Sequence, residues 1–314
     1  MVVTDKSSRS RHTRFIYPKD LDLGTDDFAH LNGRMFDISI DTDSTHAPSV
    51  TDTVPEPQAH SVSVIVPTCN EAGNVSALVA RLAGALHTET FDWELIFVDD
   101  SDDNTPEVVW RERESHHQIQ LVHRSESERV GGLAGAVQTG ITQARGDVLV
   151  VMAGDLQHPP EIVPRLIAPI IDGRVDLVVG TRYGAGGNSA GLNGWYRRLV
   201  SGSCRSLVHL LVRRSRPLSD PLSGMFAVNS AVLQGVRLQG QGFKILLEVV
   251  ARGRWNSCAD VPFDFAERQA GSSKADLHEG IVFARHLAGI YRAERRRRSG
   301  HLESSPLHGG VVAR

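Results

Sequence analysis

Between residues 61 and 183 the sequence alternates between short apolar runs rich in β-branched residues and longer amphipathic segments. The apolar runs are VSVIVP, WELIFV, IQLVHR, DVLVVM and VDLVVGTRY. After the first run, a polar turn leads into a segment with helical periodicity from Glu71 to His87, and the pattern then repeats. Strands that are apolar on both faces and separated by helices pack as a parallel sheet covered on two sides. We therefore predict a doubly wound α/β domain from Ser61 to Tyr183.

The segments that flank this alternation are less regular. Residues 1–60 are polar and rich in Asp, Ser, Thr and Pro, which predicts a largely disordered N-terminal arm. Beyond Tyr183 we predict helices in WYRRLVSGSCRSLVHLLV and GFKILLEVVARG, and short strands in SDPLSGMFAV and CADVPFDF. These elements complete one domain over residues 61–275. Residues 276–314 are predicted to form a basic amphipathic helix and a tail.

Composition limits the classes to which the chain can belong. The formal net charge of -3 and the pI near 6.5 argue against the broad basic surface that nucleic acid selects. Three widely separated cysteines do not suggest a disulfide framework. The N-terminus lacks the apolar core of a secretory signal, and no run approaches the roughly 18 to 20 apolar residues of a spanning helix. We expect a soluble or peripheral protein in a reducing, cytoplasmic compartment, with no nucleic-acid partner.

Three polar clusters follow the predicted strands directly. They are Asn70 with Glu71 after the first strand, Asp99 with Asp100 after the second, and Asp155 with Gln157 and His158 after the fourth. In an open α/β sheet, ligands bind at the carboxyl ends of the strands, where loops supply polar groups and helix N-termini. The three clusters are therefore expected to converge on one ligand site.

The acidic residues of these clusters suit different ligands. Asp99 and Asp100 could accept hydrogen bonds from a ribose or a base, or help to hold a hard cation. Asp155 and Gln157 could ligate Mg²⁺ or Mn²⁺ through oxygen, with diphosphate and water in the remaining positions. A solvated acidic turn and a helix-capping loop stay open as alternative explanations. We interpret His158 as a loop or capping residue and not as a base.

The glycine-rich segment GGLAGA opens the third predicted helix. It lacks the complete G-x-G-x-x-G pattern and does not follow the first strand, which disfavours a dinucleotide-binding oxidoreductase. Small residues at these positions are interpreted as sites where the helix packs closely against the sheet.

Eight motifs occur in the order typical of one family. They are VPTCNE, the VDD turn, GLAGAVQTG, GDLQHPPE, GTRY, SDPLSGMF, GFKILLE and ERQAGSSK. Over Ser61 to Lys274 the chain thus resembles family 2 glycosyltransferases, and specifically the polyprenol (dolichol) phosphate mannose synthases. The resemblance implies a GT-A type fold, in which a doubly wound, mostly parallel sheet with helices on both faces is completed by a C-terminal acceptor half.

The resemblance also implies where a donor substrate would bind. The nucleotide-sugar site would comprise Pro67, Asn70, Glu71, Asp99, Asp100, Gly154, Asp155, Lys244, Arg268, Ser273 and Lys274. A Mg²⁺ or Mn²⁺ ion would be held by Asp155 and Gln157. The chain departs from the family at Ala153, because the first position of this acidic motif is normally aspartate. We expect the missing carboxylate to weaken metal binding without excluding activity.

On the acceptor side, the resemblance implies a catalytic set of Asp155, Arg182, Arg197, Ser201 and Arg268, whose cations and hydroxyl surround a phosphate. Arg197 and Ser201 are four residues apart, which places both on one face of a predicted helix. An anionic phosphate can attack an anomeric carbon without a strong base. The implied reaction is therefore inverting transfer of a hexose, mannose from GDP-mannose, to a polyprenyl phosphate. From the residues alone, each arginine is equally explained as a solvated surface charge.

A lipid-linked acceptor requires contact with a bilayer surface. WYRRLVSGSCRSLVHLLVRRSR and IVFARHLAGIYRAERRRR mix apolar residues with arginine clusters, as helices at an anionic membrane surface do. Core-packing helices with basic ends explain the same pattern. We predict peripheral attachment on the cytoplasmic face of the membrane, with a membrane-protein partner as an option.

Two other functions stay open at this point. The chain could be a family 2 transferase that uses a UDP-sugar or a different acceptor, since guanine and uracil recognition are not distinguished by these motifs. It could also be a catalytically impaired homologue that binds nucleotide sugars, because Ala153 replaces a motif aspartate. Retention of Asp155, Gln157 and the arginines favours an enzyme.

Overall fold

The structure is a computed structural model that describes residues 60–183, 204–239, 244–264, 283–292 and 295, together with the backbone of residues 14–16. All of these residues belong to one compact unit. The predicted site residues Arg197, Ser201, Arg268, Ser273 and Lys274 lie outside the described residues, as do most of the predicted N-terminal arm and C-terminal tail.

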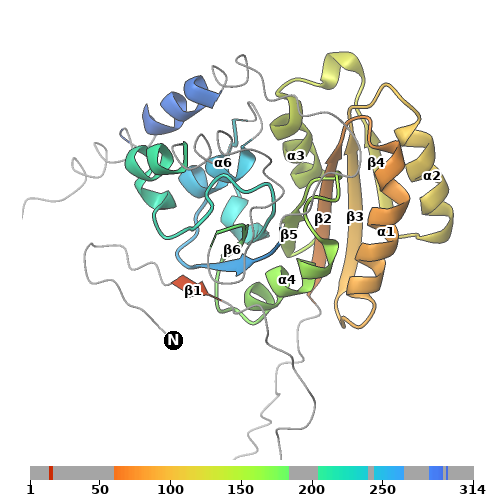
Figure 1. The fold of residues 1–314 in the computed structure, drawn as a ribbon, viewed down its shortest axis with the longest axis horizontal. Coiled ribbons are helices and arrows are strands. Elements are labelled where there is room, and N and C mark those ends of the chain that lie inside the picture. The colour runs from red at the N-terminus through yellow and green to blue at the C-terminus, as the bar shows by residue number, and fades with distance from the viewer. Residues whose placement is uncertain are drawn as a thin grey trace, which may run out of the picture. The chain divides into compact units, whose positions relative to one another are not determined.

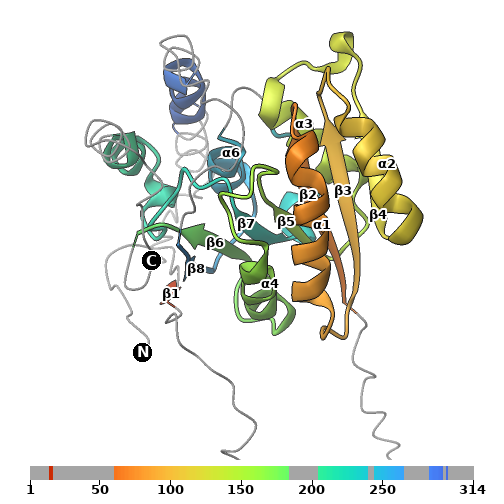
Figure 2. The same cartoon turned by 45° about the vertical axis from the view of Figure 1, so that its right-hand side comes forward.

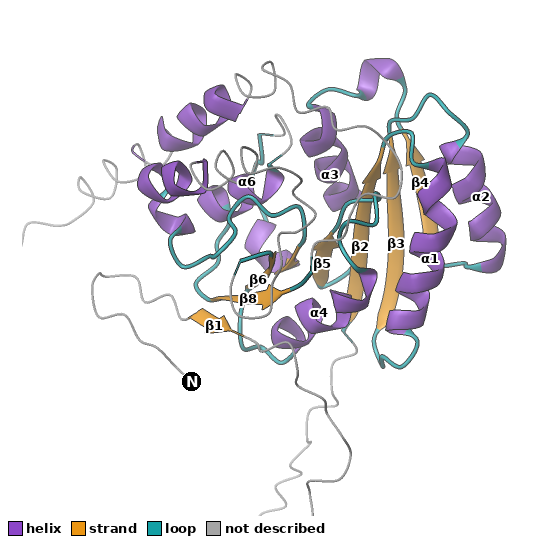
Figure 3. Ribbon diagram, viewed as in Figure 1, coloured by secondary structure: helices purple, strands orange, loops and turns teal. Residues whose placement is uncertain are grey.

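Eight strands and five longer helices with defined bounds form the described fold (Figures 1 and 3). The strands are β1 (Arg14–Ile16), β2 (Ser61–Thr68), β3 (Asp92–Asp99), β4 (Ile119–His123), β5 (Val148–Val151), β6 (Leu177–Thr181), β7 (Phe226–Asn229) and β8 (Cys258–Pro262). The helices are α1 (Ala72–Leu86), α2 (Thr105–Ser115), α3 (Gly132–Gln143), α4 (Val163–Ile171) and α6 (Ile245–Arg252). Residues 204–211 and 283–292 are also helical. Short 3₁₀ turns lie at Glu126–Glu128, Pro160–Ile162, Arg213–Ser215 and Ser230–Leu233.

The strands form one sheet in the order β1-β8-β6-β7-β5-β2-β3-β4. All neighbours are parallel except β7, which pairs antiparallel with both β5 and β6. The predicted α/β fold with a mostly parallel sheet is confirmed. The direction of β7 had no counterpart in the sequence pattern, because a four-residue strand can be inserted between two others in either direction.

Part of the predicted N-terminal arm is ordered into the sheet. Residues Arg14–Ile16 form β1, which pairs parallel with β8 so that Phe15 lies opposite Ala259. The RFI segment is short, but an aromatic and a β-branched residue in succession favour extended backbone. These three residues depart from the disorder that we predicted for most of the arm.

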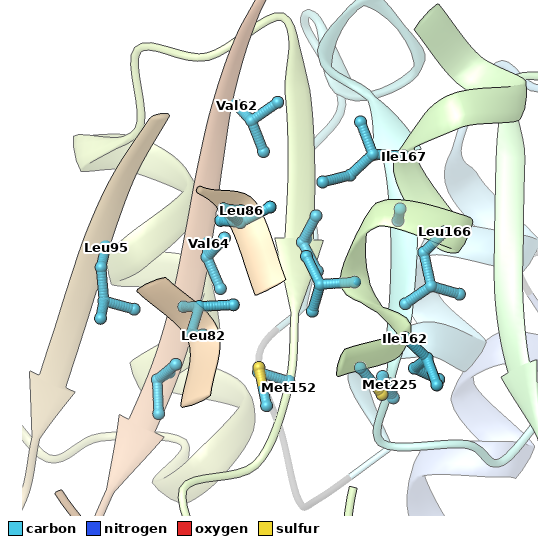
Figure 4. Close-up of a cluster of buried hydrophobic side chains, with 14 of the residues drawn as sticks. Val62, Val64, Leu82, Leu86, Leu95, Met152, Ile162, Leu166, Ile167 and Met225 are labelled. Atoms are coloured by element: carbon cyan, nitrogen blue, oxygen red, sulfur yellow. The ribbon is translucent and has the colours of Figure 1, made fainter. Parts of the chain in front are cut away.

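Alternation along β2 divides the core into two layers. Val62, Val64 and Val66 face α1, α2 and α4, whereas Ile65 faces the side of the sheet covered by α3 and α6. Figure 2 shows these helices on opposite faces of the sheet. Figure 4 shows the first layer, in which side chains from the strands meet those of α1 and α4. The strands are thus buried on both faces, as a doubly wound sheet requires.

Glycines in α3 allow this helix to lie close to the sheet. A Cβ on Gly140 would come within 2.4 Å of the Ile65 side chain, and one on Gly135 within 2.0 Å of the Val130 carbonyl oxygen. Real Cβ atoms do not tolerate such distances, so both positions require glycine. Gly140, which lies beyond the GGLAGA segment, thus packs against the sheet, whereas Gly135 within that segment packs against the Val130 carbonyl oxygen.

A third apolar cluster joins the C-terminal elements. Val208 and Val212 from the segment that includes helix 204–211, Leu247 from α6, and Leu287 and Ile290 from helix 283–292 pack together. Within the described residues, no helix has the length and apolar character needed to cross a membrane. Of the three cysteines, Cys69 is exposed, Cys204 is partly buried and Cys258 is buried.

Candidate active site

The loop after β2 is tied to the loop after β3. Asn70 has left-handed backbone (φ 61°), and its N–H donates to Ser101 Oγ at 2.7 Å. Its side-chain oxygen accepts the Asp102 N–H at 3.0 Å. Glu71 donates its N–H to Thr105 Oγ1 at 3.0 Å, at the start of α2. The predicted residues Asn70 and Glu71 therefore lie in a preorganised polar turn at the carboxyl end of the sheet.

The two aspartates after β3 occupy different environments. Asp99 is fully buried, and its carboxylate accepts hydrogen bonds from Thr68 Oγ1 at 2.7 Å and from Ser101 Oγ at 2.5 Å. His123 Nδ1 lies 2.7 Å from its other oxygen. Asp100 is only partly buried and forms a two-point ion pair with Arg124. Of this predicted pair, only Asp100 lies where a ligand could reach it, and Asp99 supports the loop from below.

Arg124 is a functional candidate that the sequence motifs did not single out. Its guanidinium donates to Asp100 Oδ1 and Oδ2 at 2.7 and 2.5 Å, and to the carbonyl oxygens of Glu128 and Gly132 at 3.3 and 3.1 Å. It thereby fastens the segment before α3 to the end of β3. The available signal was its position, because it follows β4 directly at the same sheet edge as the predicted clusters.

The acidic motif after β5 packs directly against the end of β2. A Cβ on Gly154 would lie 3.1 Å from the Thr68 methyl group, so a small residue fits best here. Leu156 has left-handed backbone (φ 57°), which is strained for a bulky side chain. This turn separates Asp155 from Gln157, whose N–H donates to Asp155 Oδ1 at 3.2 Å. Strain of this kind is typical of a loop whose side chains are held for function.

His158 is buried beneath this motif and does not cap a helix. Its ring centroid lies 5.4 Å from that of Phe263, and a Cβ on Gly224 would lie 3.3 Å from its Cε1. Burial lowers the pKa of His158 to about 4, an effect that the Asp155 carboxylate opposes and that the positive charge of Arg182 reinforces. The imidazole is therefore neutral near neutral pH. His158 lies in the loop before the Pro160–Ile162 turn, which fits the loop part of our interpretation and not the capping part.

A charged cluster from the second half of the chain lies next to His158. Arg182 follows β6 and donates from Nε and Nη2 to the two Asp220 oxygens at 2.8 and 3.2 Å. Both side chains are nearly buried, at 12% and 2% exposure. Lys244, just before α6, donates to the Leu222 carbonyl oxygen at 3.0 Å, and burial together with Arg182 lowers the pKa of Lys244 to about 8.

The charges of Asp155, Arg182, Lys244 and Asp220 all act on His158. The structure thus brings three sequence-predicted residues, Asp155, Arg182 and Lys244, into one electrostatic cluster. Asp220 joins them through Arg182, and it was not predicted individually although it stands in the SDPLSGMF motif.

A buried carboxylate fixes the outer helix of this half to α6. Glu248 is fully buried, accepts a hydrogen bond from the Gln239 N–H at 3.1 Å and contacts His286 Nε2 at 2.8 Å. It also pairs with Arg252 one helical turn later. Burial alone would raise the pKa of Glu248, but these hydrogen bonds and the Arg252 charge outweigh it and lower the pKa. Helix 283–292 is therefore anchored beside the segment that carries Lys244.

The oxygen donors present fit one particular mode of metal binding. Asp155 and Gln157 supply a carboxylate and an amide oxygen, whereas the Ala153 side chain supplies none. Within the part of the chain that the structure describes, no three Asp, Glu, His or Cys side chains gather into a metal cluster. Mg²⁺ is commonly held by one or two protein oxygens plus substrate phosphates and water. The residues present fit a cation bound in that way.

Known proteins with similar sequences are dolichol-phosphate mannosyltransferases. The enzyme of Pyrococcus furiosus is 37% identical over 236 residues, which cover 74% of this chain and 63% of that protein. The chain thus spans slightly less than two thirds of the archaeal protein. The enzyme of Mycosarcoma maydis is 36% identical over 74% of this chain and 79% of its own length, and that of Saccharomyces cerevisiae is 36% identical over 73% and 86%.

Solved structures with the same fold are sugar transferases of low sequence identity. Mannosyl-3-phosphoglycerate synthase from Rubrobacter xylanophilus superposes with a TM-score of 0.57 at 20% identity, covering 76% of each chain. Glucosyl-3-phosphoglycerate synthase from Mycobacterium tuberculosis, solved with Mn²⁺ and UDP, gives 0.54 at 20% identity over 80% of this chain and 86% of that one. The fold is therefore of the GT-A type. Because the model of glycosyl transferase family 2 also matches residues 63–219, the chain belongs to that family and is a glycosyltransferase.

Proposed function

We propose that the protein transfers a hexose, mannose from GDP-mannose, to the phosphate of a polyprenyl phosphate. Relatives at 36–37% identity carry the name dolichol-phosphate mannosyltransferase, which supports mannose as the sugar and a polyprenyl phosphate as the acceptor. The observation that carries the proposal is the cluster in which Asp155 meets Arg182 and Lys244 around the neutral His158. This cluster combines a carboxylate suited to a metal with cations suited to phosphate.

On the donor side, the nucleotide would lie against the polar turns that follow β2 and β3. Pro67 lies near the end of β2, and Asn70 and Glu71 shape the turn that follows. Asp100 presents its carboxylate beside Arg124. The buried Asp99 carboxylate accepts hydrogen bonds from Thr68 and Ser101 and so holds these two turns together. Gly154 allows the acidic motif to approach the end of β2.

Asp155 and Gln157 would hold Mg²⁺ or Mn²⁺ together with the donor diphosphate. The bound ion would supply positive charge to the departing nucleoside diphosphate. Lys244, and outside the described residues Arg268, Ser273 and Lys274, would add cations and a hydroxyl at the same diphosphate. Because Ala153 contributes no carboxylate, we expect these cations to carry more of the charge stabilisation than in a chain with the complete motif.

The acceptor phosphate would enter beside Arg182, with Arg197, Ser201 and Arg268 as further ligands. A phosphate monoester is anionic near neutral pH, so its oxygen can attack the anomeric carbon without a general base. In-line attack would form the new carbon–oxygen bond, break the bond to the nucleoside diphosphate and invert the anomeric configuration. The protein's contribution is to position two phosphate-bearing reactants and to stabilise the leaving group.

Peripheral attachment to the cytoplasmic face of a membrane belongs to the same proposal. Helix 204–211 exposes Leu207 at 44% and Leu210 at 68%, and helix 283–292 exposes Tyr291 at 37%. Apolar side chains next to arginines on exposed helices are typical of interfacial binding. Both helices belong to the half of the molecule that contains Arg182, where a lipid-linked acceptor would arrive.

The proposal is tested by incubating the purified protein with labelled GDP-mannose, Mn²⁺ or Mg²⁺ and a short polyprenyl phosphate. We expect the label to become linked to the lipid and to depend on the divalent ion. A parallel incubation with labelled UDP-glucose tests the alternative donor. Absence of lipid-linked label with either donor would overturn the proposal and favour a nucleotide-sugar-binding homologue.

Ala153 is the observation that favours this second candidate, and restoring the aspartate separates the two. For an active enzyme, Ala153→Asp should lower the Mn²⁺ concentration needed for half-maximal transfer by severalfold, because a second carboxylate strengthens a hard-cation site. Calorimetric titration of Mn²⁺ in the presence of GDP should show the same change without turnover. Unchanged Mn²⁺ affinity would remove this motif from the metal site.

A further inference from the structure

Arg205, on helix 204–211, lies beside the charged cluster and has not been assigned a role. Its guanidinium carbon is 4.5 Å from the centroid of the Tyr183 ring, and that of Arg182 is 5.7 Å from the same centroid. Tyr183 is held by reciprocal contacts with Thr181, since its N–H donates to Thr181 Oγ1 at 3.0 Å. The Tyr183 ring, on a backbone held by Thr181, thus lies near two arginines from different segments.

Stacking on a ring uses the face of a guanidinium and leaves the N–H groups on its rim available. Arg214 shows the opposite case: it lies 4.8 Å from the Trp255 ring, but it also donates to the carbonyl oxygens of Gly253 and Trp255. Arg205 has no hydrogen-bond acceptor or carboxylate partner among the described residues. Its planar fork is therefore oriented by Tyr183 and keeps the geometry that binds a phosphate at two points.

The local charge balance also points to an anion. Asp220 pairs with Arg182 at both carboxylate oxygens, so that pair is neutral as a unit. Lys244 is close enough for the Arg182 charge to lower its pKa, and Cys204, the neighbour of Arg205, also acts on Lys244. Arg182 and Arg205 thus lie near one ring, and the charge of Arg182 also acts on Lys244. Like charges held close together repel, and a bound anion relieves that repulsion.

We infer that Arg205 is a further ligand of the acceptor and binds its phosphate monoester, a role that rests on the proposed function. The observation behind it is the position of Arg205 over the Tyr183 ring, next to Arg182. The guanidinium would donate two hydrogen bonds to the attacking group's non-bridging oxygens. Arg205 would therefore determine acceptor affinity and leave donor affinity unchanged.

The test compares Arg205→Gln with Arg213→Gln in the full chain. Arg213 is exposed and follows the same helix. Arg213→Gln therefore removes one positive charge from this segment without changing the arginine that lies over Tyr183. Arg205→Gln should raise the KM for a short polyprenyl phosphate by about 10- to 100-fold, the range for charged hydrogen bonds, with the KM for the donor unchanged. Arg205→Lys should recover only part of the loss, because an ammonium lacks the planar fork. Equal acceptor KM values in the wild type and Arg205→Gln would overturn the inference.

Two further arms identify the source of the phosphate and separate this inference from the proposed function. In neutral detergent the effect of Arg205→Gln should persist, whereas an effect confined to anionic vesicles would mean that Arg205 binds membrane headgroups. Calorimetric binding of the short polyprenyl phosphate should weaken in Arg205→Gln even if no product forms. That result would retain the inference and reject the transfer reaction. If the wild type and Arg205→Gln bound the lipid phosphate equally and were equally stable to heat, the role of Arg205 would be rejected and the proposed function would stand.

Discussion

The donor-side turns and the acceptor-side cluster both lie at strand ends, but their charges are arranged differently. In the donor-side turns two ion pairs, Asp100–Arg124 and Asp102–Arg129, join neighbouring loops. In the second region Arg182 pairs with Asp220, and Arg182 and Arg205 both lie near the Tyr183 ring. The donor-side turns are thus held by local ion pairs and hydrogen bonds, whereas the second region brings together cations from distant segments, which suits a phosphate.

The two regions also differ in how the chain assembles them. Asn70, Ser101 and Asp102 belong to successive strand-to-helix turns of adjacent strands. By contrast, Arg182 meets Asp220 after the chain has left the sheet, and Lys244 reaches Leu222 from the start of α6. A substitution on the acceptor side should therefore affect packing between distant segments, and one on the donor side should act more locally.

The largest expected effect comes from Arg182→Ala, which would leave the Asp220 carboxylate buried without this partner. Breaking a buried ion pair costs about 3–5 kcal/mol of unfolding free energy, and transfer should also be lost. Urea unfolding would measure the first effect and labelled transfer the second. As a control, Arg81→Ala breaks an exposed pair with Glu161 and should cost at most about 1 kcal/mol.

Adding Asp220→Asn to Arg182→Ala sharpens this test, because it removes the stranded charge. Stability should recover in part while transfer stays absent, since the phosphate would still lack Arg182. Recovery of both properties would mean that Arg182 serves packing alone. Equal costs for Arg182→Ala and Arg81→Ala would contradict the contrast between the two regions.

His158 lies at the junction of the two regions and should make the protein sensitive to acid. Burial lowers the pKa of His158 to about 4. As the pH falls below 6.5, the imidazole is therefore protonated in the unfolded chain while it is still neutral in the folded protein. The contribution of the neutral His158 to the free energy of unfolding is fully present above pH 6.5 and is lost as the pH falls toward 4. It amounts to about 3 kcal/mol over that interval.

His158→Gln should therefore lose less stability than the wild type between pH 6.5 and pH 4.5, as measured by urea midpoints. His117→Gln, which removes an exposed imidazole near the far end of β4, provides the matched control and should follow the wild type. Parallel curves for His158→Gln and the wild type would place the acid sensitivity elsewhere.

These differences explain which features the sequence could predict. The sheet and its two covering layers were predictable because valine and isoleucine alternate in uninterrupted strands such as β2. The polar turns were predictable because parallel strands end at a common edge. Burial of Asp99 beneath Asp100 was not, because two adjacent aspartates look alike until the pleat directs one inward. The Arg182–Asp220 pair was also hidden, since 38 residues separate its members.

Two smaller features show the same limit. The antiparallel β7 depends on a four-residue strand, too short for its direction to be encoded in a local pattern. His158 stands before two prolines, which suggested a capping loop, and its burial against Phe263 depends on β8 arriving from more than 100 residues later. The periodicity of the sequence therefore predicted the sheet and its helices. The arrangement of the second half depends on contacts between residues far apart in the sequence, which no local pattern reveals.

The smallest expected effect concerns the pH range set by Lys244, which comes from the second half of the chain and is proposed to bind the donor diphosphate. With a pKa of about 8, Lys244 is charged below pH 8 and loses its proton above it. If the Lys244 ammonium neutralises a substrate phosphate, kcat/KM should decrease above pH 8, with a limiting slope of about tenfold per pH unit. Lys244→Arg should lower activity at pH 7 only modestly and should remove that alkaline fall, because a guanidinium does not deprotonate in this range. If Lys244→Arg showed the same fall in kcat/KM above pH 8, the titration would belong to another group. Lys244 would then serve packing only, through its hydrogen bond to the Leu222 carbonyl oxygen.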